Sequence, residues 1–331
     1  MPSSAEGTKL IMSSQTILDV AGLSTTFHVK RANKKYALKA VDNVSFHLDN
    51  GEILGFVGET GCGKTTVGRS IIKLARPEAG VVIFGGDNIL GLSGRRLREV
   101  RLKVRMVFQD PYASLNPRRR IDDSVAEAGD IHKLFKSPQD RLKQIAETLK
   151  RVGLDPSFAN RFPHELSGGQ RQRVGIARAI LPIPDIIIAD EPVSALDVSI
   201  QAQILNLLLD LRKRLNLAII FISHDLSVVG QICDRIAVMY LGRVVEIGEA
   251  EELFNRPQHP YTQALIDAVP KPNPRLRNRK GLALGEPPSR FELKPGCTYA
   301  DRCPLAEGIC LTEVPEIKIL QNGQRAACHK L

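Results

Sequence analysis

The stretch GETGCGKTT (58–66) decides the fold of this chain, because it fits the pattern G-x-x-x-x-G-K-[ST] in the surroundings that pattern requires. The apolar run ILGFV (53–57) precedes it, and the helix-like stretch TVGRSIIKL (66–74) follows it. Glycines let backbone N–H groups surround phosphates at a helix N-terminus, where unpaired donors and the helix dipole favour an anion. We predict that Lys64 reaches the β- and γ-phosphates and that the Thr65 hydroxyl ligates Mg²⁺. The predicted ATP-binding residues of this loop are Gly58, Glu59, Thr60, Gly61, Cys62, Gly63, Lys64, Thr65 and Thr66.

Acidic residues end a second apolar run, IIIADEP (186–192). Mg²⁺ prefers carboxylate and water oxygens, so Asp190 is the predicted carboxylate on the metal side. Glu191, one residue on, is predicted to orient and deprotonate the attacking water. Three more polar residues follow apolar runs on what should be the same edge of the sheet, where ligands gather in open α/β folds: Gln109, Asp197 and His224. Taken singly, His224 could be a structural histidine and Gln109 part of an ordinary turn.

Apolar runs without alternation predict parallel strands buried on both faces, at 53–57, 186–189 and 217–222. Helical patterns lie between them and predict a doubly wound α/β core. One predicted helix begins at Ser137-Pro138, with Asp140 as its capping partner, and stops at Gly153. The apolar stripe of this helix is Leu142, Ile145, Leu149 and Val152, and that of a later one is Ile204, Leu207, Leu208, Leu211 and Leu215.

The chain divides by composition into three parts. Residues 1–15 read as an N-terminal tail, and residues 16–255 as the α/β domain with a helical insertion over about 112–182. From 256 to 331 the chain becomes Pro-rich and basic, and it then carries four of the six cysteines, so a linker and a small appended module are expected.

Composition narrows the possible partners. The formal net charge of +10 fits a nucleic acid, an anionic membrane or an anionic nucleotide. There is no Trp and no aromatic interleaving of basic residues, so we predict no nucleic-acid partner. The basic runs at 118–120 and 274–280 are interpreted as solvated faces, with phospholipid or partner contact as the alternative. No apolar run approaches the roughly 18 residues of a spanning helix, and no leader pattern opens the chain, so a cytoplasmic location is expected.

The stretch LSGGQRQR (166–173) is a second turn suited to holding a phosphate, about a hundred residues after the first. It opens a helix whose inward stripe is Val174, Ala177 and Leu181. A single nucleotide has no use for two such turns, so the second is predicted to serve another nucleotide. We therefore expect a head-to-tail pair of domains, in which Ser167, Gly168 and Gly169 of one cap the γ-phosphate bound by its partner, and hydrolysis requires closure of the pair.

This ordered set of motifs resembles that of an ATP-binding-cassette ATPase, over residues of roughly 16–255. The resemblance implies a RecA-like P-loop NTPase core with an antiparallel β subdomain and a helical subdomain. It implies that Gln109 senses the metal and couples to a transmembrane partner, and that His224 holds the γ-phosphate. The predicted catalytic residues are therefore Gln109, Glu191 and His224. The predicted Mg²⁺ ligands are Thr65, Gln109 and Asp190. An aromatic residue usually stacks on adenine, and Tyr36 is our prediction with Phe27 as the alternative. The implied signature is Leu166, Ser167, Gly168, Gly169 and Gln170, and the implied dimer loop is Ser194, Ala195, Leu196 and Asp197.

Flanking segments carry a closer resemblance. FQDPYASLNPRRRI (108–121), HPYTQALIDAVPKPNP (259–274) and the stretch 285–317 are similar to the ATP-binding subunits of bacterial dipeptide and oligopeptide importers, in particular the F-type subunit. The resemblance implies a heterologous pair of ATPases at the cytoplasmic face of the inner membrane. It also implies two membrane permeases and an extracytoplasmic binding protein. Related importers carry nickel, sugars or opine-like compounds, so the cargo stays open.

Four cysteines mark the last part of the chain: Cys297, Cys303, Cys310 and Cys328. Structural zinc usually needs a closely spaced Cys pair, which is missing here, and disulfides suit secreted proteins better. Four thiolates could hold a [4Fe–4S] cluster, but the spacing leaves this and other uses open. The resemblance to the importer family implies the cluster. Cys62 is interpreted as a small filler in the phosphate loop and Cys233 as a core residue.

Two other functions are compatible with the ATPase fold, and a third is less so. A soluble ATPase acting on ribosomes or nucleic acid would usually join two cassettes or insert a long coiled coil, and neither pattern is visible. An iron–sulphur sensor would use ATP only as a regulator. A GTPase is a weaker rival, because no N/T-K-x-D motif appears and NKKY (33–36) lacks the Asp.

Overall fold

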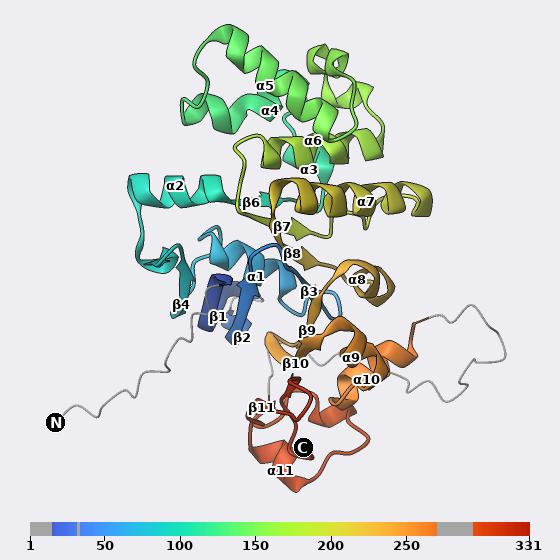
Figure 1. The fold of residues 1–331 in the computed structure, drawn as a ribbon. Helices are drawn as coiled ribbons and strands as arrows, with labels where there is room; N and C mark the ends of the chain where they lie inside the picture. The colour runs from blue at the N-terminus through green and yellow to red at the C-terminus, as the bar shows by residue number, and fades with distance from the viewer. Residues whose placement is uncertain (1–14, 32–33, 270–293) are drawn as a thin grey trace.

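The computed structural model describes residues 15–31, 34–269 and 294–331 (Figure 1). The predictions for the N-terminal tail up to residue 14 and for the basic run 274–280 therefore concern residues outside the described part. Within the described ranges, no helix is both long and apolar enough to cross a lipid bilayer.

The centre of the molecule is a parallel sheet buried on both faces. Five parallel strands lie in the order β9-β3-β8-β7-β6. Their bounds are β3 (Ile53–Val57), β6 (Val104–Val107), β7 (Ile186–Asp190), β8 (Ala218–Ile222) and β9 (Arg235–Tyr240). Leu54 and Phe56 pack into one core, whereas Ile53 and Val57 pack into the other. Each residue of β3, β7 and β8 is buried, so the strands predicted from unbroken apolar runs are confirmed.

Helices cover both faces of this sheet (Figure 1). They are α1 (Lys64–Ile71), α2 (Gly94–Lys103), α7 (Val198–Leu215) and α8 (Leu226–Ile232). The predicted apolar stripe of α7 is buried from Ile204 to Leu211, and it packs in the same core as Ile53. The doubly wound α/β core is thus confirmed.

An antiparallel sheet lies over the core on the side of α1. Its strands, in the order β2-β1-β4-β5, are β1 (Thr16–Arg31), β2 (Lys34–Asp49), β4 (Ala79–Phe84) and β5 (Asp87–Asn88). Leu18 and Val20 of β1 share a core with Phe56 of the parallel sheet. Thr25 and Ser70 join β1 to α1 through a buried hydrogen bond of 2.8 Å between their hydroxyls. The antiparallel β subdomain implied by the sequence is therefore present.

Between β6 and β7 the described chain is helical, and it forms the top of the view in Figure 1. The helices are α3 (Pro111–Ser114), α4 (Ile121–Ile131), α5 (Pro138–Arg151) and α6 (Gly168–Ile180), and short 3₁₀ turns lie at Pro156–Asn160 and Pro163–Glu165, whereas another 3₁₀ turn, Ile89–Gly91, precedes α2. The start of α5 is as predicted, because the Ser137 hydroxyl accepts a hydrogen bond from the Asp140 N–H at 3.1 Å. The predicted apolar stripe of α5 is buried from Ile145 onward, but its first residue, Leu142, is 60% exposed. Periodicity shows which positions share a helix face, but not whether a neighbour covers that face along its whole length.

The C-terminal part joins the core sheet rather than standing apart from it. Its elements are β10 (Arg243–Glu249), α9 (Ala250–Asn255), α10 (Pro260–Asp267), a 3₁₀ turn (Ala300–Arg302), α11 (Gly308–Thr312), β11 (Lys318–Ile319) and β12 (Arg325–Ala326). β12 pairs with β10 and extends the sheet to eight strands. The buried Glu246 carboxylate of β10 accepts hydrogen bonds from the N–H groups of Gln258 (2.8 Å) and His259 (2.9 Å). This contact fixes the start of α10 beside the sheet.

Candidate nucleotide-binding site

The phosphate loop connects β3 to α1 and is wrapped around a buried lysine. Lys64 Nζ donates to the carbonyl oxygens of Gly58 (2.7 Å) and Glu59 (3.1 Å). Gly63 has φ 113°, and a Cβ there would lie 2.2 Å from the Ala40 carbonyl oxygen, so this turn requires glycine. Thr60 and Gly61 are exposed at the mouth of the loop. Cys62 is buried, in agreement with its interpretation as a filler.

The predicted metal ligands Thr65 and Asp190 lie side by side. Thr65 Oγ1 donates to Asp190 Oδ1 at 2.7 Å. Asp190 is fully buried at the end of β7, and burial raises the pKa of its carboxyl group. Its other oxygen, Oδ2, has no hydrogen-bond partner among the described residues. A hydroxyl beside a buried carboxylate with a spare oxygen is a donor set that suits Mg²⁺, so these residues fit the ion.

The three predicted catalytic residues meet at one carboxylate. Glu191 Oε2 accepts a hydrogen bond from Gln109 Nε2 at 2.9 Å and lies 3.2 Å from His224 Nδ1. Glu191 has φ 44°, an uncommon value for a residue with a side chain, and its N–H donates to the Ile222 carbonyl oxygen at 2.9 Å. The backbone therefore turns sharply after β7 and holds the Glu191 side chain between the ends of the neighbouring strands.

Strand order explains why these residues come together. β3, β8, β7 and β6 are consecutive neighbours in the parallel sheet. At their carboxyl ends the chain carries, in the same order, the phosphate loop, His224, the Asp190-Glu191 pair and Gln109. In open α/β sheets this edge is where ligands bind. A nucleotide on the loop would thus have its terminal phosphate facing the Glu191 cluster.

The second glycine turn starts α6, with Ser167 exposed and Gly168 and Gly169 half-buried. Ser167 is the N-cap of α6: its hydroxyl accepts from the Gln170 N–H at 3.3 Å, while its own N–H donates to Gln170 Oε1 at 2.9 Å. Leu166 is buried beneath the turn. A Cβ on Gly169 would lie 2.7 Å from Ile200 Cγ2, so the turn is pressed against the start of α7.

The predicted dimer loop adjoins this glycine turn. A Cβ on Gly168 would lie 3.5 Å from Leu196 Cδ2, so the two predicted motifs touch. Ser194, Ala195 and Asp197 are exposed, and the neighbouring Val198 side chain is 82% exposed. Within the chain, α6 packs on α3, α4, α5, α7 and β6, whereas α1 packs on β1, β2, β7 and β8. The glycine turn and the predicted dimer loop therefore lie next to each other, and both have exposed residues. The elements that pack around α6 differ from those that pack around α1, the helix of the phosphate loop.

Both candidates for adenine stacking lie on the hairpin of β1 and β2. Phe27 pairs with Leu38 and Val29 pairs with Tyr36 in the antiparallel register. Directly opposed residues share a face of the sheet, so Phe27 and Tyr36 lie on the same face, with the pair of His28 and Ala37 between their two pairs. Phe27 is 41% exposed and Tyr36 is half-buried.

The sequence analysis missed two residues at the phosphate loop, both from the C-terminal part of the chain. Arg302 donates to both carboxylate oxygens of Glu59, at 2.8 and 3.0 Å. The Tyr261 hydroxyl accepts a hydrogen bond from the Glu59 N–H at 3.0 Å. These partners are separated by about two hundred residues or more along the chain, and no local pattern marks such a pair.

The four C-terminal cysteines line one small pocket together with His259, Tyr299 and Leu305. Burial, and then the neighbouring thiols, raise the pKa of Cys297 and of Cys303. Within residues 15–31, 34–269 and 294–331, no group of three or more His, Cys, Asp or Glu side chains is placed to hold a metal ion. The structure thus brings the four thiols to one place without supporting the predicted cluster. Cys233 is buried in the core, as predicted.

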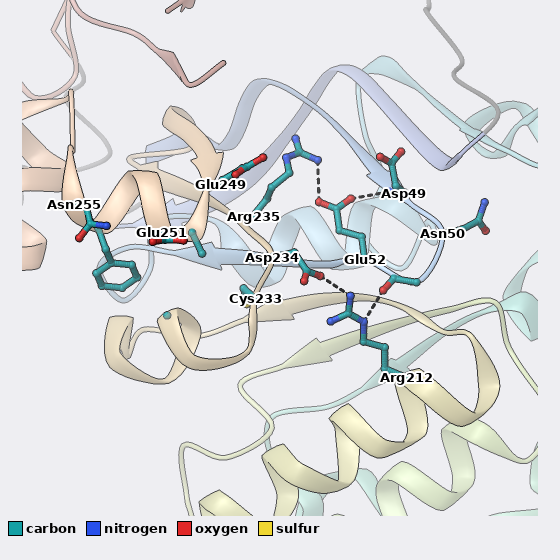
Figure 2. A pocket seen from close by; sticks show the side chains of 14 residues that line it. Asp49, Asn50, Glu52, Arg212, Cys233, Asp234, Arg235, Glu249, Glu251 and Asn255 are labelled. Carbon is teal, nitrogen blue, oxygen red and sulfur yellow. Dashed lines mark hydrogen bonds and ion pairs between the residues drawn. The ribbon is translucent and has the colours of Figure 1, made fainter. Parts of the chain in front are cut away.

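A separate cavity of about 770 Å³ lies at the opposite edge of the sheet, where β3 and β9 begin (Figure 2). Four of its charged side chains form two ion pairs: Arg235 with Glu52 at 2.9 Å and Arg212 with Asp234 at 2.8 Å. Asp234 also accepts a hydrogen bond from the Ile53 N–H at 2.8 Å. These contacts tie α7 to the start of β3. The walls of this cavity therefore stabilise the end of the sheet that lies opposite the nucleotide site.

The fold and the site define an ATP-binding-cassette ATPase. The family described as ABC transporter matches residues 41–194. The ATP-binding cassette MJ0796, solved as a dimer in a post-hydrolysis state bound to ADP and Pi, superposes with a TM-score of 0.62. It is 30% identical, over 70% of this chain and 98% of that one.

The closer relatives share the C-terminal part as well. The family described as the C-terminal region of oligopeptide/dipeptide transporters matches residues 245–310. The oligopeptide transport ATP-binding protein AppF of Bacillus subtilis is 48% identical over 321 residues, which are 95% of this chain and 97% of AppF. OppF of the same organism is 48% identical over 302 residues, 87% of this chain and 98% of OppF.

The chain belongs to the family of peptide and oligopeptide transport ATP-binding proteins. The resemblance stated from the sequence is confirmed, and with it the ATPase class. Membership does not favour a ribosome- or nucleic-acid-directed ATPase, nor an ATP-regulated iron–sulphur sensor. Subunits of this kind act in pairs and associate with permease components at the membrane.

Proposed function

We propose that this chain is the ATP-hydrolysing subunit of an importer for dipeptides or oligopeptides, bound to the cytoplasmic face of the membrane. The observation that carries the proposal is the contact of Glu191 with both Gln109 and His224, beside the Thr65–Asp190 pair. The names of the relatives and the C-terminal match at 245–310 support peptides as the cargo.

In the proposed reaction the loop N–H groups of residues 58–66 hold the phosphates of ATP. Lys64 exchanges its contacts with two loop carbonyls for the β- and γ-phosphates. Thr65, Asp190 and Gln109 would hold Mg²⁺, which supplies positive charge against the phosphate oxygens. Glu191 removes a proton from the attacking water, and His224 holds the γ-phosphate from the neighbouring strand end.

The proposed site is completed by a second ATPase subunit. The turn Ser167–Gly169, of which Ser167 is exposed, presents a helix N-terminus, which favours an anion, beside the exposed Asp197. In a head-to-tail pair this turn caps the γ-phosphate bound by the partner, with Leu166 and Gln170 holding it in shape, and Asp197 bridges the two halves. We propose a heterologous partner, as the likeness to the F-type subunit implies.

Coupling to transport is mechanical in this proposal. Closure of the ATPase pair moves two membrane permeases, and an extracytoplasmic binding protein delivers the peptide. Gln109 would link ATP hydrolysis to the movement of the permeases. Its side chain contacts Glu191, and the segment that follows it leads directly into α3 at the start of the helical subdomain. Tyr36 remains our prediction for adenine stacking, with Phe27 as the alternative.

Reconstitution tests this function. The chain, co-purified with its partner ATPase and two permeases, is placed in proteoliposomes with a binding protein and a labelled oligopeptide. We expect ATP-dependent peptide uptake that stops when Mg²⁺ is chelated. Association with ribosomes or DNA instead, with ATP turnover unaffected by the membrane partners, would contradict the proposal.

We further propose a [4Fe–4S] cluster on Cys297, Cys303, Cys310 and Cys328. The four thiols line one pocket, and the likeness to the importer family implies that they hold the cluster. Anaerobic purification tests it: we expect about four irons per chain and visible absorbance that bleaches on reduction. Colourless, iron-free protein that retains full ATPase activity would count against it.

A further inference from the structure

One residue of the phosphate loop, Glu59, is bound on three sides. Its carboxylate accepts two hydrogen bonds from Arg302, at 2.8 and 3.0 Å. Its N–H donates to the Tyr261 hydroxyl at 3.0 Å, and its carbonyl accepts from Lys64 Nζ at 3.1 Å. Two of the three partners come from the C-terminal part of the chain. The loop therefore does not take its shape from its own glycines alone.

Arg302 is itself held in one position. Its side chain is 8% exposed, and it donates to the Tyr240 hydroxyl at 3.1 Å. Tyr240, Tyr261 and Tyr299 are fully buried and pack ring on ring, with centroids 4.6 to 5.3 Å apart. The hydrogen bond to Glu59 raises the pKa of Arg302, so the guanidinium stays charged. A rigid aromatic base thus presents a fixed positive charge to the phosphate loop.

The turn that carries Arg302 lies between two of the pocket cysteines. The Ala300 N–H donates to the Cys297 carbonyl oxygen at 3.0 Å, and the Cys303 N–H donates to the Ala300 carbonyl oxygen at 3.2 Å. Cys297 is in turn joined to Cys310, through a hydrogen bond of 2.8 Å from its N–H to the Cys310 carbonyl oxygen. A rearrangement of the cysteine pocket would therefore move Arg302.

We propose that Arg302 is a positioning residue for nucleotide binding, which couples the cysteine pocket to the phosphate loop through Glu59. The proposal rests on the function given above, in which this loop binds ATP. Arg302 has two effects: it fixes the loop, and it neutralises a carboxylate that would otherwise repel the phosphates of ATP. Because coupling between two sites is reciprocal, ATP on the loop must also stabilise the turn that carries Arg302.

Arg302→Gln in the full chain tests the proposal. We expect ATP, measured by calorimetry with Mg²⁺ present, to bind about tenfold more weakly, within the usual range for coupled sites. The double variant Glu59→Gln with Arg302→Gln should recover affinity to about that of Glu59→Gln alone, because the unpaired carboxylate is gone. Lys294→Gln is the matched control: it removes the exposed ion pair with Asp301 in the same module, 2.9 Å long, and should leave affinity unchanged.

Hydrogen exchange tests the reciprocal effect. Adding ATP to the wild-type chain should slow exchange of the backbone amides of residues 297–312, and Arg302→Gln should abolish this protection. If Arg302→Gln does not fold, Arg302→Lys replaces it, with an intermediate loss of affinity expected because the two-bond geometry is lost. Unchanged ATP affinity in Arg302→Gln, or no gain from the double variant, would overturn the inference. A wild-type chain that binds no ATP would overturn the proposed function, and the inference with it.

Discussion

Glu191→Gln will lower the turnover of ATP by about a thousandfold and leave ATP binding intact. Glutamine keeps the shape of the side chain and can still contact Gln109 and His224, which lie 2.9 and 3.2 Å from Glu191 Oε2. It cannot accept a proton from water. The variant should accumulate as a stable ATP-bound pair. Phosphate release in a single turnover measures the loss of hydrolysis, and an equilibrium titration measures ATP binding.

Glu99→Gln is the control for this prediction, because Glu99 lies on α2 and forms only an exposed ion pair with Arg95 among the described contacts. Its turnover should equal that of the wild type. A Glu191→Gln chain that hydrolyses ATP within about tenfold of the wild-type rate would exclude Glu191 as the base, since general bases typically contribute 10²–10⁴-fold.

Ser167→Asp is expected to lower turnover of the assembled pair by about a hundredfold, a typical effect of losing one preorganised donor. Aspartate is as good an N-cap as serine, so α6 should still begin at this residue. Its negative charge, however, would face the γ-phosphate of the partner. Because Ser167 is exposed and is proposed to act on the other subunit, ATP binding to the isolated chain should not change.

Ser137→Asp provides the matched control. Ser137 caps α5 through the same type of contact, a 3.1 Å hydrogen bond from the Asp140 N–H, but it lies on the far helices of the helical subdomain. The turnover of the Ser137→Asp variant should equal that of the wild type. If the two variants lose activity equally, the effect of Ser167→Asp comes from the helix start and not from the partner's nucleotide.

The two glycine turns have different surroundings, which agrees with the proposal that they serve different nucleotides. The turn at 58–66 is closed around Lys64 at the edge of the core sheet. The turn at 166–170 exposes Ser167 to solvent and lies against Leu196 of the predicted dimer loop. In the function proposed here, the first turn binds the nucleotide of its own chain and the second acts on the nucleotide of a partner subunit.

The sequence predicted the parts of the molecule that local chemistry determines. The strands at 53–57, 186–190 and 218–222 follow from unbroken apolar runs, and the start of α5 follows from Ser137 and Asp140. The predicted catalytic residues meet because they end neighbouring parallel strands, which the α/β pattern implied.

Other features have no local signal. β11 and β12 are two residues long, too short for a periodic pattern, yet they extend the core sheet. Burial of Glu246 depends on two backbone donors that only the folded chain supplies. The contact of Glu59 with Arg302 spans 243 positions, and nothing in the sequence around Arg302 marks it as a partner of the phosphate loop. Leu142 shows the opposite failure, in which a clear helical pattern overestimated burial.

The central claim is that the glycine turn of one subunit completes the ATP site of another. The most direct measurement holds this chain at fixed concentration, titrates the partner ATPase, and follows ATP turnover together with the paired fraction by analytical ultracentrifugation. The account predicts that turnover rises in proportion to the paired fraction and is near zero for monomers. Full-rate turnover by strictly monomeric chains, with Ser167 facing solvent, would contradict it.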